Sequence, residues 1–187
     1  MCSINGFNFK NEELVRKMNA VTSHRGPDGS GIFFDDNISL GHDRLSIVDL
    51  SSAASQPMHV SGRYSIVFNG EIYNYLELKE ELRDFYKFTT KSDTEVILAA
   101  YKKWGRVCVE KFNGVFAFAI WDSKEKELFL ARDHVGIKPL YYFFDGKKFI
   151  FSSEIKSILE HNIPRMVDRE AFNFYFHVYY VPEPLTM

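Results

Sequence analysis

The sequence predicts an α+β fold in which layers of antiparallel strands are combined with helices. The second half of the chain contains four apolar and aromatic runs separated by short polar turns, a pattern typical of consecutive antiparallel strands. These runs cover residues 115–121, 127–131, 140–144 and 148–152. Apolar residues recur at helical spacing in segments before and after them. Strands grouped in this way, preceded and followed by helices, favour a layered α+β domain.

Length, charge and composition limit the classes of protein to which this chain can belong. The chain has 187 residues, of which 45% are apolar and 26% charged, enough for one core and a short remnant of a second unit. Its net charge is -2, so no nucleic-acid partner is expected. No apolar run reaches the ~20 residues of a membrane helix, and the N-terminus does not resemble a signal peptide. We expect a cytoplasmic protein with no membrane partner.

The cysteines and histidines form no pattern typical of a disulfide or a metal site. The two cysteines, Cys2 and Cys108, belong to no Cys-x-x-Cys pair, so no structural disulfide is expected. Cys108 lies between two valines and is most simply a small buried residue. The six histidines show no spacing that would place two on one helix face, and no Walker-type glycine loop is present. No metal or other cofactor is therefore predicted for this chain.

The first forty residues predict short strands, one helix and a glycine-rich loop. Residues 2–7 suit a buried strand, and Asn11 is expected to cap a helix that begins with two glutamates. Residues 26–31 contain three glycines and a proline, which predicts a loop that either approaches a ligand closely or simply connects two elements. Strands are expected at 31–34 and 38–42, joined by a turn of hairpin composition.

The middle of the chain is predicted to place an amide and a backbone N–H at the end of a strand. Residues 51–62 are rich in Ser, Ala, Gly and Pro and are interpreted as a mobile flap. A strand at 63–68 then runs into Asn69 and Gly70. Asn-Gly often forms a hairpin turn, but too few residues follow for a return strand before a helix predicted at 76–85. We therefore expect Asn69 and Gly70 at a strand end, pointing into a cleft.

Residues 92–95, Ser-Asp-Thr-Glu, have the form of a capping box. They predict a helix that ends with Gly105 as its C-cap. Asp93 would lie in the first turn, where the helix dipole favours an acid without any ligand. The polar connection at 132–139 is interpreted as structural.

The last segments predict two short helices and the truncated start of a second domain. The helices should begin near residues 153 and 168. Residues 172–180 are so aromatic that they need a partner surface, and a Pro-Glu-Pro break follows them. We expect a cut inside a longer polypeptide. Residues 2–160 would form one domain, and 161–187 a linker and the truncated start of a second.

Cys2 follows the initiator methionine, so removal of Met1 would place a thiol and a free α-amine on one residue. The amine, whose pKa is about 7.7–8.0 in model compounds, can take the thiol proton directly or through one water. Such a residue carries both nucleophile and base. The alternative is a small apolar residue that opens a strand, and Cys2 alone does not separate the two. Arg44, with five fixed donors, suits a carboxylate.

Several motifs occur in order between residues 2 and 180. They are Cys2-Ser3-Ile4, His24-Arg25-Gly26-Pro27-Asp28-Gly29, Arg44-Leu45-Ser46-Ile47-Val48-Asp49, Asn69-Gly70-Glu71, Ser92-Asp93-Thr94-Glu95 and the run from Ala131 to Tyr142. Together they resemble the glutaminase domain of class II glutamine amidotransferases, most closely that of glutamine-hydrolysing asparagine synthetases.

The resemblance implies a four-layer αββα sandwich of the N-terminal nucleophile hydrolase type. It implies that Cys2 attacks the side-chain amide of glutamine, while the Asn69 amide and the Gly70 N–H hold the oxyanion. Arg44 would bind the α-carboxylate of glutamine, and Glu71 with Asp93 its α-ammonium group. The backbone of the following residues would line the pocket: Leu45, Ser46, Ile47 and Val48.

The resemblance also implies a C-terminal synthetase domain that uses the released ammonia to amidate aspartate. The Ser-Gly-Gly-x-Asp-Ser type of loop expected there does not occur in this chain, so ATP and Mg are expected only in the missing domain. A homodimer is a further expectation. One alternative is a synthetase-like enzyme with another acceptor, such as a sugar or a peptide. Another is a catalytically silent glutamine-binding module, which persistence of Met1 would favour.

Overall fold

A computed structural model describes residues 1–183 and 185 and confirms the α+β class. Within these residues the strands form two antiparallel sheets. The first sheet has the order β2 (Gly29–Phe34), β3 (Ser39–Arg44), β1 (Ser3–Phe7), β9 (Phe149–Ser152), β8 (Tyr141–Phe144). The second has the order β4 (Met58–Val60), β5 (Tyr64–Ile72), β6 (Gly114–Asp122), β7 (Glu127–Arg132). The four strands predicted in the second half are all present.

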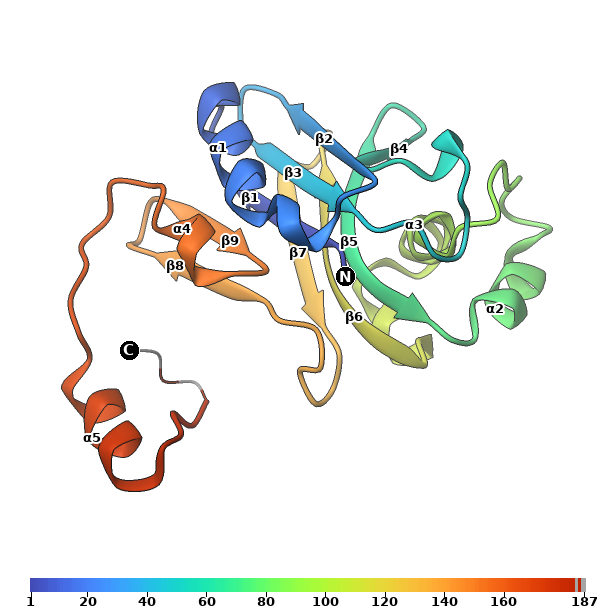
Figure 1. The fold of residues 1–187 in the computed structure, drawn as a ribbon. Helices are drawn as coiled ribbons and strands as arrows, with labels where there is room; N and C mark the ends of the chain where they lie inside the picture. The colour runs from blue at the N-terminus through green and yellow to red at the C-terminus, as the bar shows by residue number, and fades with distance from the viewer. Residues whose placement is uncertain (184, 186–187) are drawn as a thin grey trace.

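Helices cover the outer face of each sheet (Figure 1). Helices α1 (Glu12–Thr22) and α4 (Ile155–Ile158) lie on the first sheet, and α2 (Tyr75–Leu82) and α3 (Asp93–Trp104) on the second. A separate apolar cluster fills the space between the sheets, with Leu40 from one and Val67 and Ala117 from the other. Three apolar layers between four structural layers confirm the predicted αββα sandwich.

Strand β1 is fixed in the centre of the first sheet, so the start of the chain has a defined position. It pairs with β3 on one side and β9 on the other. The buried Asn5 amide donates to Asn19 Oδ1 at 3.0 Å and to Thr22 Oγ1 at 2.9 Å. Its oxygen accepts from the hydroxyls of Ser152 and Ser157. Because buried polar groups are costly unless paired, this network holds β1 in one register.

The glycine-rich segment is only partly a loop. The prediction for residues 26–31 is wrong at its C-terminal end, because β2 already begins at Gly29 and pairs with β3. A Cβ on Gly31 would lie 2.1 Å from the carbonyl oxygen of Gln56. Glycine is thus needed here for close approach of another chain segment, a tertiary requirement that the sequence does not reveal.

Two further expectations about loops need correction. The segment at 51–62, interpreted as a flap, contains a short 3-10 helix (Ser52–Ala54) and strand β4, which pairs with β5. The strand that carries Asn69 and Gly70 does not end there, because β5 continues to Ile72 and pairs with β6 along its whole length. The second error arises because the partner strand β6 is distant in sequence, whereas β4 pairs with β5 across a short turn.

The helix caps follow the sequence, with one exception. Asn11 Oδ1 accepts from the N–H of Leu14 at 3.0 Å, and Gly105 ends α3 with a positive φ of 63°. Ser92 caps α3 by accepting from Thr94 N. The reciprocal half of the predicted capping box is wrong, because the carboxylate of Glu95 instead accepts from the preceding loop.

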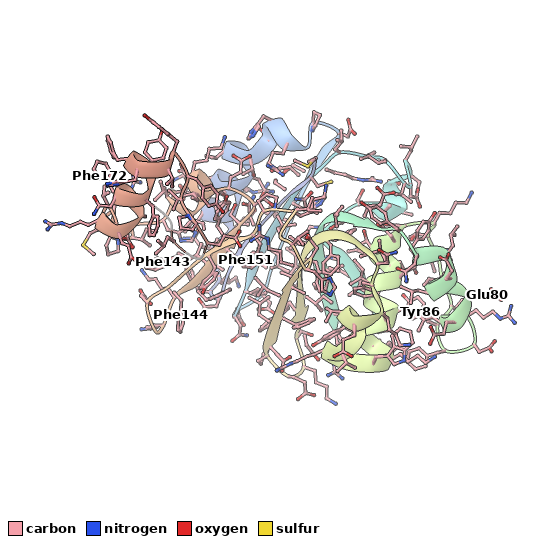
Figure 2. All side chains as sticks on the ribbon, turned by 90° about the horizontal axis from the view of Figure 1, so that it is seen from below. Glu80, Tyr86, Phe143, Phe144, Phe151 and Phe172 are labelled. Carbon is pink, nitrogen blue, oxygen red and sulfur yellow. The ribbon has the colours of Figure 1, made fainter. Side chains whose placement is uncertain are left out.

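Helix α5 (Arg169–Val178) extends away from the sandwich (Figure 1). Its cap is Asp168, close to the predicted start. Several of its aromatic side chains are exposed, among them Phe172 and Phe176. Figure 2 shows Phe172 at the opposite end of the molecule from Tyr86. That this segment needs a partner surface stays a prediction.

Both cysteines are free thiols, and Cys108 is fully buried as predicted. In the part of the chain that the structure describes, no helix is long and apolar enough to cross a membrane.

We expect Gly41→Ala to destabilise the fold. Gly41 lies on β3 under α1, and an added Cβ would stand 2.1 Å from Asn19 Oδ1 and 2.9 Å from Val15 Cγ2. Moving Asn19 also disturbs its bond to Asn5. The free energy of unfolding in urea should fall by about 1–3 kcal/mol. In the control Gly29→Ala nothing lies within 4 Å of the new Cβ, and an equal loss there would contradict this explanation.

Candidate active site

A cavity of about 100 Å³ lies where the start of the chain meets the edge of β5. It is bordered by the loop after β3, by β5 and by the first turn of α3. Every residue predicted to be catalytic or substrate-binding lines it. They are Cys2, Arg44, Leu45, Ser46, Ile47, Val48, Asn69, Gly70, Glu71 and Asp93. The fold therefore brings four separate sequence motifs to one place.

The Cys2 side chain is held by backbone groups. Its Sγ accepts from the N–H of Leu45 at 3.3 Å and lies 3.5 Å from the Leu45 carbonyl oxygen, to which the thiol can donate. Arg25 Nε donates to the carbonyl oxygen of Cys2 at 3.0 Å. Burial raises the pKa of the Cys2 thiol, while the Leu45 N–H, the terminal amine and Arg44 act in the opposite direction. The sulfur is thus positioned but protonated, and needs a base to become a nucleophile.

Beyond Ile66, the edge of β5 opposite β6 has no strand partner among the described residues. The N–H of Phe68 donates to Gln56 Oε1 at 2.6 Å, and its carbonyl oxygen accepts from His42 Nε2 at 3.0 Å. Both polar groups of Phe68 therefore point away from β6. Because backbone groups in an antiparallel strand alternate with a period of two residues, those of Gly70 also point to this free edge. The Gly70 N–H is thus directed toward the cavity.

The amide nitrogen of Asn69 is buried without a partner. The residue is 1% exposed, and its Nδ2 has no hydrogen-bond acceptor among the described residues. An unsatisfied buried donor costs about 1–3 kcal/mol, so native structures rarely retain one without a reason. An acceptor atom of a ligand in the cavity would satisfy it.

Two cations, Arg44 and Lys138, and three carboxylates, Asp49, Glu71 and Asp93, border the same cavity. Arg44 donates to the carbonyl oxygens of Ser51, at 2.9 Å, and of Asp49. Asp93 Oδ2 accepts from Ile72 N at 3.1 Å. Burial raises the pKa of Asp93 to about 6, and the neighbouring Glu71 adds to this shift. The set of charges suits a ligand that carries both an anionic and a cationic group.

Sequence reasoning missed several cavity residues. Gln56 and Lys138 both line the cavity, although they lie in segments interpreted as a flap and as a structural connection. Lys138 Nζ lies 3.5 Å from the sulfur of Met1. The structural interpretation of 132–139 holds for Asp133, whose carboxylate accepts from the N–H groups of Phe116, Ile137 and Lys138. No local signal could have found these positions, because only the fold brings them to Cys2.

Among residues 1–183 and 185, no three His, Cys, Asp or Glu side chains cluster as metal ligands would.

The architecture defines the class of the protein. A solved structure of glutamine phosphoribosylpyrophosphate amidotransferase from Bacillus subtilis aligns with a TM-score of 0.72 at 22% identity, covering 84% of this chain and 43% of that one. At this identity the likeness establishes the fold alone. The shared fold is the two-sheet sandwich with helices on its outer faces, as predicted.

The family follows from sequence comparison. A family model described as a glutamine amidotransferase domain matches residues 1–187, and the chain belongs to this family. A putative glutamine-hydrolysing asparagine synthetase 2 of Methanocaldococcus jannaschii is 42% identical over 213 aligned positions, covering 100% of this chain and 41% of the relative. Glutamine-hydrolysing asparagine synthetase 1 of B. subtilis is 44% identical, with 94% and 28% covered. The predicted family is confirmed, and the chain spans less than half of either relative.

The reactivity of the two thiols should report the environment of Cys2. With Met1 attached, we expect alkylation of Cys2 by iodoacetamide to become half-maximal above the pH of about 8.5 typical of a free thiol, because burial raises its pKa. Cys108, whose pKa burial raises to about 12, should react more slowly throughout. Peptide mass spectrometry separates the two sites. A half-maximal rate for Cys2 below pH 8 would contradict the buried geometry.

Proposed function

We propose that this chain hydrolyses glutamine to glutamate and ammonia, with Cys2 as the nucleophile after removal of Met1. The observation that carries the proposal is the buried, unpartnered Asn69 amide in the same cavity as the Cys2 thiol. A thiol alone would support many functions. A thiol together with unused N–H donors supports acyl transfer, because that reaction develops negative charge on an oxygen.

The reaction begins with proton transfer from the thiol to the α-amine of Cys2. The sulfur attacks the carbonyl carbon of the glutamine side chain, and the resulting oxyanion accepts from Asn69 Nδ2 and the Gly70 N–H. Collapse of this intermediate, with return of the proton to the leaving nitrogen, releases ammonia and forms a thioester on Cys2. Water then hydrolyses the thioester to glutamate and restores the thiol.

The charges around the cavity fit a free amino acid. Arg44 would bind the α-carboxylate of glutamine, and Glu71 and Asp93 its α-ammonium group. Backbone groups of the loop after β3 would line the space between them, contributed by Leu45, Ser46, Ile47 and Val48. Buried Asp93 is more costly as an anion than as an acid, so a bound ammonium group would stabilise its charged form.

The activity of the whole protein belongs to the same proposal. The relatives named asparagine synthetases are more than twice as long as this chain. We propose that residues 2–160 form the glutaminase domain and that 161–187 lead into a synthetase domain. Ammonia would be used there for ATP- and Mg-dependent amidation of aspartate, in a cytoplasmic enzyme that forms a homodimer. No residue of this chain is assigned to ATP or Mg.

Cys2→Ala should abolish glutamine hydrolysis while leaving the thermal midpoint of unfolding nearly unchanged, because only one small side chain is lost. Glutamate release from glutamine is the assay, and intact mass reports whether Met1 has been removed. Activity should scale with the fraction of processed chain. The matched control Cys108→Ala, which removes the other thiol, should stay active. Residual hydrolysis by Cys2→Ala, or full activity in protein that retains Met1, would refute this mechanism.

Glutamine binding should weaken in mild acid. The pKa of Asp93 is raised to about 6 in the free protein, so the carboxylate is lost as the pH falls through that value. The Kd of glutamine for Cys2→Ala, measured by calorimetry, should rise about tenfold between pH 7 and pH 5. Using this variant separates binding from chemistry. Asp93→Asn should bind weakly at both pH values, and a Kd for Cys2→Ala that is flat over this range would contradict the role of Asp93.

A further inference from the structure

The loop after β3 is folded around Asp49. The carbonyl oxygen of Asp49 accepts from the guanidinium of Arg44, which also donates to the carbonyl oxygen of Ser51 at 2.9 Å. One carboxylate oxygen of Asp49, Oδ1, accepts from the N–H of Ser51 at 2.9 Å. Asp49 therefore closes the turn that holds the Arg44 side chain in place.

The other carboxylate oxygen of Asp49 binds the segment before α3, on the opposite side of the cavity. Asp49 Oδ2 accepts from the N–H of Lys91 at 3.0 Å, although the two residues are 42 positions apart. Lys91 stands just before Ser92, the cap of α3, and Asp93, its first residue. Hydrogen bonds from Ser51 and Lys91 lower the pKa of Asp49 to about 2, so the bridging group is a carboxylate at any pH at which the protein would work.

Both ends of this bridge are attached to rigid elements. On one side, Asp28 Oδ2 accepts from the N–H of Ser46 at 2.7 Å, which ties the loop to the segment before β2. On the other, the carboxylate of Glu95 accepts from the N–H and hydroxyl groups of Thr89 and Thr90. The segment before α3 is therefore fastened to the helix, and a displacement of Lys91 would be transmitted to its first turn.

We propose that Asp49 is a positioning residue that sets the separation between Arg44 and Asp93 and so selects ligands with a carboxylate and an ammonium group on one carbon. This inference rests on the proposed function, because it assumes that these two groups bind the α-carboxylate and α-ammonium of glutamine. Asp49 acts through Arg44 and Asp93, by way of its hydrogen bonds to the backbone of Ser51 and Lys91. The expected ligands are free α-amino acids.

Asp49→Asn is the test, because asparagine keeps the size of the side chain but replaces one acceptor oxygen by an NH₂ group. In the processed enzyme, KM for glutamine should rise about tenfold while kcat stays within a factor of about two, since one hydrogen bond to a charged group is lost and the reacting atoms are untouched. Inactivation of Cys2 by a chloroketone analogue of glutamine, which carries the same α-groups, should slow by the same factor. Alkylation of Cys2 by iodoacetamide, which lacks them, should not change.

Asp145→Asn is the matched control. Asp145 Oδ1 also accepts from two backbone N–H groups, those of Lys147 and Lys148 at 3.0 and 2.7 Å, but in the hairpin between β8 and β9. This variant should leave KM and both inactivation rates unchanged.

Each other outcome overturns the inference in a recognisable way. If Asp49→Asn leaves KM unchanged in an active enzyme, the positioning role is wrong and the proposed function stands. If Asp49→Asn lowers kcat, the rate of iodoacetamide labelling and the affinity for glutamine together, Asp49 supports the loop as a whole and does not set the separation between Arg44 and Asp93. If the processed wild-type chain releases no glutamate, the proposed function fails and the inference fails with it.

Discussion

The hydrogen bond between His42 on β3 and the carbonyl oxygen of Phe68 on β5 joins the two sheets at the point on which the site depends. Burial lowers the pKa of His42 to about 4, so the ring is neutral, and its Nε2 must carry the proton because a carbonyl can only accept. Gln56 holds the N–H of the same residue. Both polar groups of Phe68 are thus fixed, which orients the next two residues of β5. Asn69 and Gly70 line the same cavity as Cys2, and this connection between the sheets holds them there.

The site is held in an arrangement that is unfavourable without a ligand. Burial raises the pKa values of Cys2 and Asp93, and the Asn69 amide lacks an acceptor. The raised pKa of Asp93 and the unpartnered Asn69 amide each oppose folding at neutral pH by an amount of order 1 kcal/mol or more. The surrounding sandwich offsets this cost through three apolar layers. Perturbed and unpaired groups that converge on one cavity are typical of functional sites.

The sequence predicted those parts of the structure that depend on local chemistry. Asn11 and Gly105 cap helices as expected, and the spacing of apolar residues located the strands of the second half. The candidate site was predicted through family resemblance, and the fold brings all of its residues to one cavity. The predictions that failed depend on contacts between segments that lie far apart in the sequence. Strand β5 continues past Gly70 because β6 pairs with it, and Lys138 lines the cavity in a connection after β7 that Asp133 ties to β6. Such pairings join residues far apart in the chain, which periodicity and turn chemistry do not report.

The central claim is that β5 presents two donors, the side-chain amide of Asn69 and the backbone N–H of Gly70, to the carbonyl oxygen of an amide held beside Cys2. A crystal structure of processed Cys2→Ala with bound glutamine tests it most directly. The account predicts that the side-chain oxygen of glutamine accepts from both Asn69 Nδ2 and the Gly70 N–H, with the α-carboxylate at Arg44. A bound glutamine whose side-chain oxygen points elsewhere, leaving the Asn69 amide without a partner, would contradict it.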